Sequence, residues 1–105
     1  MKRIVTLLLS FNLIYANAET STSWINPCNK NNENKQCNSI QNGIDNLIHQ
    51  INYLHATKIL LKYNGVNKTI AQQTKKSVIK ECNQCEITLE LNNNTNYGVE
   101  AILNY

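Results

Sequence analysis

The sequence predicts a small α+β domain, in which one long amphipathic helix packs on an antiparallel sheet of four or five strands and disulfides staple the fold. Three observations predict this class. Residues 39–56 repeat apolar side chains at helical spacing, residues 87–105 alternate apolar and polar side chains as strands do, and the chain of 105 residues holds four cysteines. A chain of this length is expected to form one domain.

The first 18 residues have the order of a secretory signal peptide. Two basic residues follow Met1, residues 4–14 are mostly apolar, and Ala16 and Ala18 form a small-x-small cleavage site. The apolar run is too short to cross the hydrocarbon core of a bilayer as a helix. We therefore predict a secreted or periplasmic protein with residues 19–105 as its mature domain.

The mature chain is nearly neutral. Its eight lysines and seven acidic residues give a formal charge of +1, which argues against nucleic acid as a partner. A domain of this size buries a limited share of its surface and often needs covalent staples. In an exported chain the cysteines are expected to supply them as disulfides; they are Cys28, Cys37, Cys82 and Cys85.

Residues 39–56 form the predicted core helix. On a helical wheel six apolar residues share one sector of about 120°; they are Ile40, Ile44, Leu47, Ile48, Ile51 and Leu54. Asp45, Asn46, His49 and Asn52 point away from that sector. Ser39 is placed to accept an early backbone N–H as the N-cap, and the helix is expected to end near residue 57.

Residues 19–38, before the helix, have no apolar period. Their Asn residues and Pro27 favour turns, so we expect an irregular Asn-rich arm that is held by its two cysteines. Trp24, the single Trp of the chain, is expected to cover one end of the core.

Residues 58–63 are predicted to be a strand, followed by a hairpin turn. Asn64 and Gly65 both tolerate a positive φ, which a type I′ turn requires, and the turn would pair Tyr63 with Val66. The alternative continues the helix to Tyr63 with Gly65 as its C-cap.

Residues 72–81 fit two structures. Their apolar face is thin enough for a surface helix, yet residues 77–81 fit a short strand of an antiparallel meander, which we favour. Residues 87–91 and 99–105 alternate more clearly and predict a C-terminal hairpin with one buried face. An alternative fold therefore has two helices plus this hairpin.

The expected layout resembles the cystatin architecture in general outline. The Gln-x-Val-x-Gly hairpin that carries protease inhibition in that family is missing, because the hairpin predicted here reads Tyr63-Asn64-Gly65-Val66-Asn67. The resemblance therefore concerns architecture alone.

The disulfides are predicted to link the arm to the sheet. Pairing Cys37 with Cys82 and Cys28 with Cys85 closes long loops, which removes more chain entropy than local bonds do. The swapped long pairing and the local pairs Cys28–Cys37 and Cys82–Cys85 remain alternatives. Cys82 and Cys85 also have the spacing of a redox CxxC motif, but no βαβ pattern is predicted around them, so we expect a structural role.

No coherent catalytic or metal-binding set is present in the sequence. His49 and His55 lie six residues apart, which does not give the i, i+4 pair of a helical metal site. His49 is expected on the helix surface and His55 at the margin of the core. We predict no metal, no cofactor and no enzymatic activity.

Lysines gather between residues 58 and 80, where no acidic residue occurs, whereas residues 81–100 hold four Glu and no base. The predicted binding surface consists of Lys58, Lys62, Lys68, Lys75, Lys76 and Lys80. Such a face would attract an acidic partner, an anionic glycan or a lipid surface. Asn67 and Asn93 each begin a glycosylation sequon.

These features favour a small exported, non-catalytic binding protein, such as an inhibitor or an immunity-type partner, with a protein as its ligand. One alternative is a secreted toxin or effector. Another is a thiol–disulfide protein that uses Cys82 and Cys85.

Overall fold

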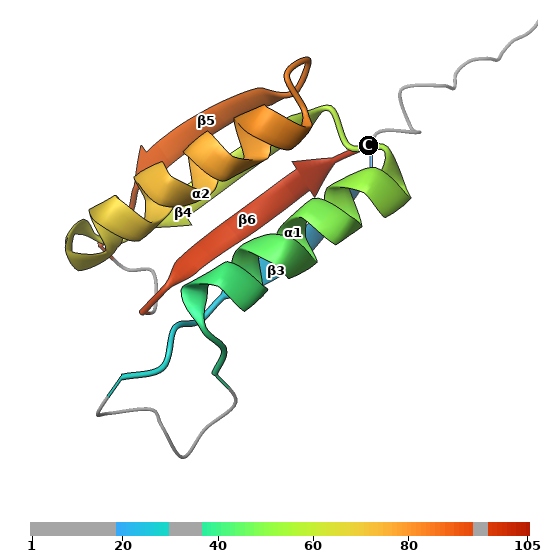
Figure 1. The fold of residues 1–105 in the computed structure, drawn as a ribbon. Helices are drawn as coiled ribbons and strands as arrows, with labels where there is room; N and C mark the ends of the chain where they lie inside the picture. Colours follow the sequence, from blue (N-terminus) through green and yellow to red (C-terminus); the bar gives the residue numbers. More distant parts are fainter. Residues whose placement is uncertain (1–18, 30–36, 94–96) are drawn as a thin grey trace, which may run out of the picture.

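The computed structural model describes residues 19–29, 37–93 and 97–105, and the predicted signal peptide lies outside them. These residues form an α+β fold of two helices and a four-stranded mixed sheet (Figure 1). In chain order the elements are β3 (Thr20–Ile25), α1 (Ile40–Leu54), β4 (Lys58–Tyr63), the short 3₁₀ helix η3 (Gly65–Asn67), α2 (Lys68–Glu81), β5 (Glu86–Leu91) and β6 (Val99–Asn104). Neither described α-helix is long and apolar enough to cross a membrane.

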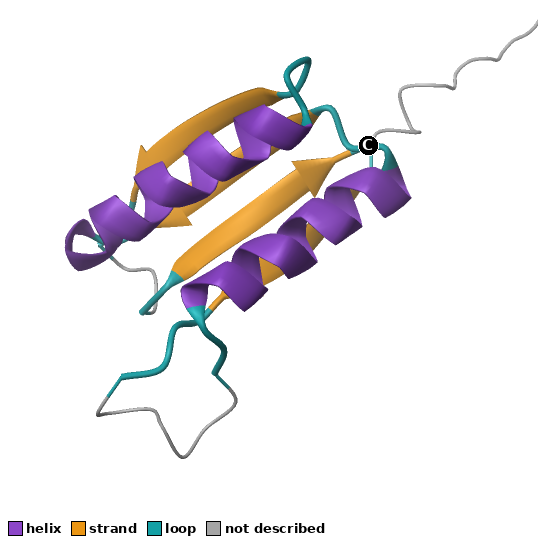
Figure 2. Ribbon diagram, viewed as in Figure 1, coloured by secondary structure: helices purple, strands orange, loops and turns teal. Residues whose placement is uncertain are grey.

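The strand order is β3-β6-β4-β5, and both helices lie on one side of the sheet (Figure 2). The last strand, β6, runs antiparallel to β3 on one side and to β4 on the other. Strands β4 and β5 are parallel and are joined by α2. The predicted C-terminal hairpin is therefore wrong, because β4 separates β5 from β6, and so is the expectation of a purely antiparallel sheet.

The core lies between the helices and alternate residues of the central strands. In β4 and β6 these residues are buried; they are Ile59, Leu61, Tyr63, Val99, Ala101 and Leu103. The predicted helix stripe is confirmed, since Ile44, Leu47 and Ile51 are buried and the other three stripe residues pack against the core. The Ser39 hydroxyl accepts a hydrogen bond from the Asn42 N–H at 3.1 Å, as its predicted capping role requires.

Helix α1 is shorter than the predicted range, at 15 residues. It ends at Leu54 because His55 adopts a left-handed conformation, with a φ of 57°. His55 is exposed rather than at the margin of the core. A second helix, α2, lies beside α1 on the same side of the sheet, so the single-helix outline shared with cystatins does not hold.

The N-terminal arm contains an edge strand that the sequence did not predict. Strand β3 has no apolar alternation, and it forms because β6 offers six residues for antiparallel pairing, from Thr20 opposite Asn104 to Ile25 opposite Val99. Beyond it, Pro27 bridges to Asn38 and the backbone N–H of Cys28 donates to the Asn38 carbonyl.

The strand at 58–63 is confirmed, but the hairpin after it is wrong. The Asn64 side chain accepts a hydrogen bond from the Val66 N–H at 3.2 Å and caps η3, which leads directly into α2. Residues 72–81 are therefore helical, contrary to the strand we favoured. The thin stripe formed by Ala71, Thr74 and Val78 is fully buried against the sheet, which is sufficient to hold the helix.

The predicted disulfide pairing is also wrong, because both bonds are local. Cys28 bonds to Cys37 and Cys82 bonds to Cys85, with Cα–Cα distances of 5.1 and 5.4 Å. Cys37 precedes the start of α1, whereas Cys82 lies near Ala56 beyond its end. A helix of 15 residues is about 22 Å long, which no disulfide can span.

Candidate interaction surface

One face of the sheet is covered by helices, and no described element covers the other. Side chains alternate along each strand, so the residues between the buried positions point to this second side, which we call the open face. It is built from twelve residues, three on each strand. They are Thr20, Thr22 and Trp24 on β3; Glu100, Ile102 and Asn104 on β6; Lys58, Leu60 and Lys62 on β4; and Glu86, Thr88 and Glu90 on β5.

The strand register arranges the open face in three rows across the sheet. The middle row is Thr22, Ile102, Leu60 and Thr88, with the two apolar residues at its centre. One outer row is Trp24, Glu100, Lys62 and Glu90, and the other is Thr20, Asn104, Lys58 and Glu86. The open face therefore has a half-buried apolar centre and a charged or polar margin.

Trp24 lies at the β3 edge of this face and is half-buried. Its neighbour Ile25 points the other way, to the helix side, where it is fully buried against Gly43 of α1. The expectation that Trp24 covers one end of the core does not describe this position. Sequence reasoning missed the open face, since Trp24, Leu60 and Ile102 come to lie on one face only because β6 inserts between β3 and β4.

A shallow pocket of about 240 Å³ lies at one end of the open face. It is lined by Lys58, Ile59, Leu60, Glu86, Thr88 and Asn104. Ligand pockets commonly run from about 300 to 1,000 Å³. The pocket is thus small for a cofactor and suits a single side chain of a protein partner.

The structure divides the six lysines of the predicted binding surface between two sides of the molecule. Lys58 and Lys62 lie on the open face, and the other four lie on α2, across the sheet from them. Lys58 is the register partner of Glu86, and Lys62 stands between Glu90 and Glu100. The open face therefore mixes both signs of charge.

The lysines of α2 form a separate, basic surface. Lys68, Lys76 and Lys80 are exposed and Lys75 is half-exposed.

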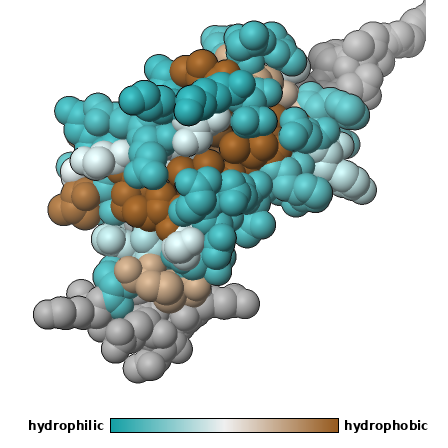
Figure 3. Space-filling model, viewed as in Figure 1, coloured by the Kyte–Doolittle hydropathy of each residue, from teal (hydrophilic) through white to brown (hydrophobic). Residues whose placement is uncertain are grey.

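On the same helix-bearing side, apolar residues are visible between the two helices (Figure 3). A second cavity of about 220 Å³ lies between the end of α1 and the turn after α2, where its lining includes Ile51, His55, Cys82 and Gln84.

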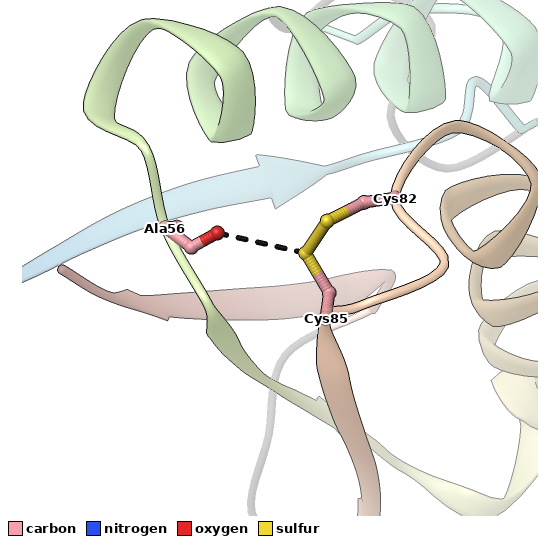
Figure 4. Close-up of a disulfide and its surroundings, with 3 residues drawn as sticks. All are labelled: Ala56, Cys82 and Cys85. Atoms are coloured by element: carbon pink, nitrogen blue, oxygen red, sulfur yellow. Dashed lines mark hydrogen bonds between the residues drawn. A yellow bond between two sulfur atoms is a disulfide. The ribbon is translucent and has the colours of Figure 1, made fainter.

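The Cys82–Cys85 bond lies at the negative end of a helix, because Cys82 is the C-cap of α2. Redox CxxC motifs place a thiolate at a helix N-terminus, whose positive end stabilises it. Here the helix dipole disfavours a thiolate. Cys85 Sγ lies 3.5 Å from the Ala56 carbonyl oxygen (Figure 4), and since a disulfide sulfur carries no proton, this is a packing contact that fastens the turn to the end of α1.

No three His, Cys, Asp or Glu side chains gather into a possible metal site within the residues that the structure describes. His49 is exposed on the outer side of α1, as predicted, and His55 caps the same helix.

Comparison with known proteins adds no relative: no family model, curated protein or solved structure matches the chain.

Proposed function

We propose that this chain is an exported, non-catalytic binding protein whose open face docks a protein partner. The observation that carries the proposal is a sheet face that no described element covers, with Leu60 and Ile102 at its centre and Trp24 at its β3 edge. Both described helices lie on the opposite face of the sheet.

The composition of the open face matches that of protein interfaces. Their cores are depleted in charge and enriched in aromatic residues, while their margins are polar and wet. Trp is also among the residues whose truncation most weakens binding. Trp24 is already half-buried in the free chain, so ordering its ring on binding costs little side-chain entropy.

The charges on the open face would select the partner rather than supply most of the affinity. Lys58 and Lys62 alternate with three Glu side chains across neighbouring strands. A partner must present the complementary pattern, because opposed like charges at an interface cost several kcal/mol. Mixed charge favours a protein surface over a uniformly anionic glycan or lipid surface.

The test is to capture the partner with purified protein from the compartment into which the chain is exported. Wild type should retain one protein at a fixed stoichiometry, and Leu60→Lys should lose it, because a charge enters the apolar centre of the open face. Asn52→Lys makes a similar change at an exposed position on α1 and should retain the partner. A photo-crosslinking residue at Thr88 should reach the same protein.

Trp24 gives a second readout, because it is the single Trp of the sequence. Adding the captured partner should shift its emission to the blue as the ring loses water. If Leu60→Lys and Asn52→Lys retain the partner equally, or if no protein crosslinks from Thr88, the open face is not the binding surface.

A further inference from the structure

We infer that β3 is a dimerisation edge, where a second copy of this chain adds its own β3 in antiparallel orientation to form one continuous sheet. Strands β3 and β5 form the two edges of the sheet. An edge strand presents unpaired backbone groups, and proteins usually protect it with charges, Pro or a bulge. Within Thr20–Ile25 there is neither a charged residue nor Pro, and all six residues are in regular register with β6.

The hydrogen bonds fix which backbone groups of β3 point outward. Glu19 and Tyr105 exchange two backbone bonds, of 2.9 and 3.0 Å, and such pairs alternate along an antiparallel ladder. The odd-numbered residues of β3 therefore bond to β6. The N–H and C=O groups of Thr20, Thr22 and Trp24 face the free edge.

These outward groups match those of a second copy in one register. A twofold axis at Thr22 sets Thr22 opposite Thr22 of the other copy and Thr20 opposite its Trp24. All three outward residues then form hydrogen-bonded pairs, each of which exchanges two N–H···O=C bonds. Because the same residues point to the open face, that face becomes continuous across the axis, with the two Trp24 rings beside it.

The side of α1 that lies above β3 also carries no charged side chain that would repel a second copy. Gly43 of α1 packs on Ile25, which identifies the side of α1 that faces β3. Asn46, Gln50 and Tyr53 follow it at spacings of three or four residues, are exposed and carry no charge; Tyr53 is 73% exposed. Within the two elements β3 and α1, Asp45 is the single charged side chain.

The opposite edge is less suited to self-pairing. The bonds from Glu86 N–H to Thr57 and from Asn92 N–H to Tyr63 show that even-numbered residues of β5 bond to β4. Pairing of the odd-numbered residues about a twofold axis would align Glu86 and Glu90 of both copies along one seam on the open face. Carboxylates in such proximity repel one another, whereas the β3 seam has none.

The test uses the purified, disulfide-intact mature chain and sedimentation velocity across a range of concentrations. Wild type should double in mass as concentration rises. Thr22→Lys should stay monomeric at all of them, because two like charges meet on the axis. The matched control, Thr88→Lys, places the same substitution at an exposed position on β5 of the open face and should dimerise like wild type.

Two further variants make the register itself testable. Thr22→Lys mixed with Thr22→Glu should recover the dimer, which shows that the loss is not caused by misfolding. Thr22→Cys should form an intermolecular disulfide under mild oxidation, since its two copies face each other, whereas Thr20→Cys should not. A wild type that stays monomeric at millimolar concentration, or equal behaviour of Thr22→Lys and Thr88→Lys, would overturn the inference without bearing on partner binding by the open face.

Discussion

At the scale of single residues, the contact between Asn67 and Gly98 joins the start of α2 to the start of β6. Asn67 is 1% exposed, and its side-chain oxygen accepts a hydrogen bond from the buried Gly98 N–H at 2.9 Å. Gly98 has a φ of +109°, and a Cβ there would collide with the Ile25 carbonyl oxygen, so only glycine fits. The buried Asn67 amide also leaves no room for a glycan at this sequon, whereas Asn93 is exposed.

Replacing Asn67 tests this contact. Asn67→Ala leaves the Gly98 N–H buried without its acceptor, which should lower the free energy of unfolding by about 1–3 kcal/mol in urea melts. Asn93→Ala removes a similar bond, to the Gly65 N–H at 3.3 Å, at an exposed site and should change stability by less than about 0.5 kcal/mol. Similar losses in both variants would show that burial does not set the value of the bond.

At the scale of elements, α1 supplies three buried apolar side chains to the core and packs three more against it. Its capping hydroxyl and its apolar stripe agree, so local preference and tertiary packing support the same helix. Helix α2 differs, because its buried stripe contains Thr74, whose hydroxyl donates to the Ile70 carbonyl at 2.7 Å. This internal bond lets a polar residue sit fully buried, and it explains why the helix was hard to recognise from apolar spacing.

The stripe of α1 can be measured directly. Ile51 is 3% exposed, so Ile51→Ala should lower the free energy of unfolding by about 2–5 kcal/mol, through lost burial and the cavity that remains. The adjacent Asn52 is exposed, and Asn52→Ala should stay within about 0.5 kcal/mol of wild type. Equal midpoints and slopes in urea for the two variants would exclude α1 as the principal core element.

At the scale of the whole molecule, charge separates the two halves of the described domain. Within β3 and α1 the single charged side chain is Asp45, whereas β4, α2 and β5 carry six Lys and three Glu. A neutral half suits contact with an identical copy, and a charged half favours solubility. The two local disulfides are compatible with an oxidising compartment outside the cytosol.

Export with cleavage after Ala18 remains a prediction, and it fits the sheet. The new N-terminus would be Glu19, which hydrogen-bonds to Tyr105 immediately before β3 begins, so processing leaves the strand whole. Mass spectrometry of the exported protein should find residues 19–105 with both disulfides formed. Recovery of a chain that still begins at Met1 from a membrane fraction would contradict this.

The sequence by itself determined the core helix, its Ser39 cap, the strand at 58–63, the strand character of residues 87–91 and 99–104, and the α+β class. Each of these follows from a local period or from capping chemistry, which act between residues a few positions apart. The open face could not be predicted, although Thr88 and Glu90 on β5 and Glu100 and Asn104 on β6 were visible as the polar half of an alternation. Leu60 and Ile102 become neighbours through pairing across 42 positions of sequence.

Only the tertiary structure decided the strand order, the helix at 72–81, the strand β3 and the disulfide pairing. Residues Thr20–Ile25 lack a period of their own and become a strand because β6 supplies the hydrogen-bond partners. The favoured long disulfides followed from loop entropy, which is a property of the unfolded chain. The long disulfides cannot form in the folded chain, because the two cysteine pairs lie at opposite ends of α1, farther apart than a disulfide can span.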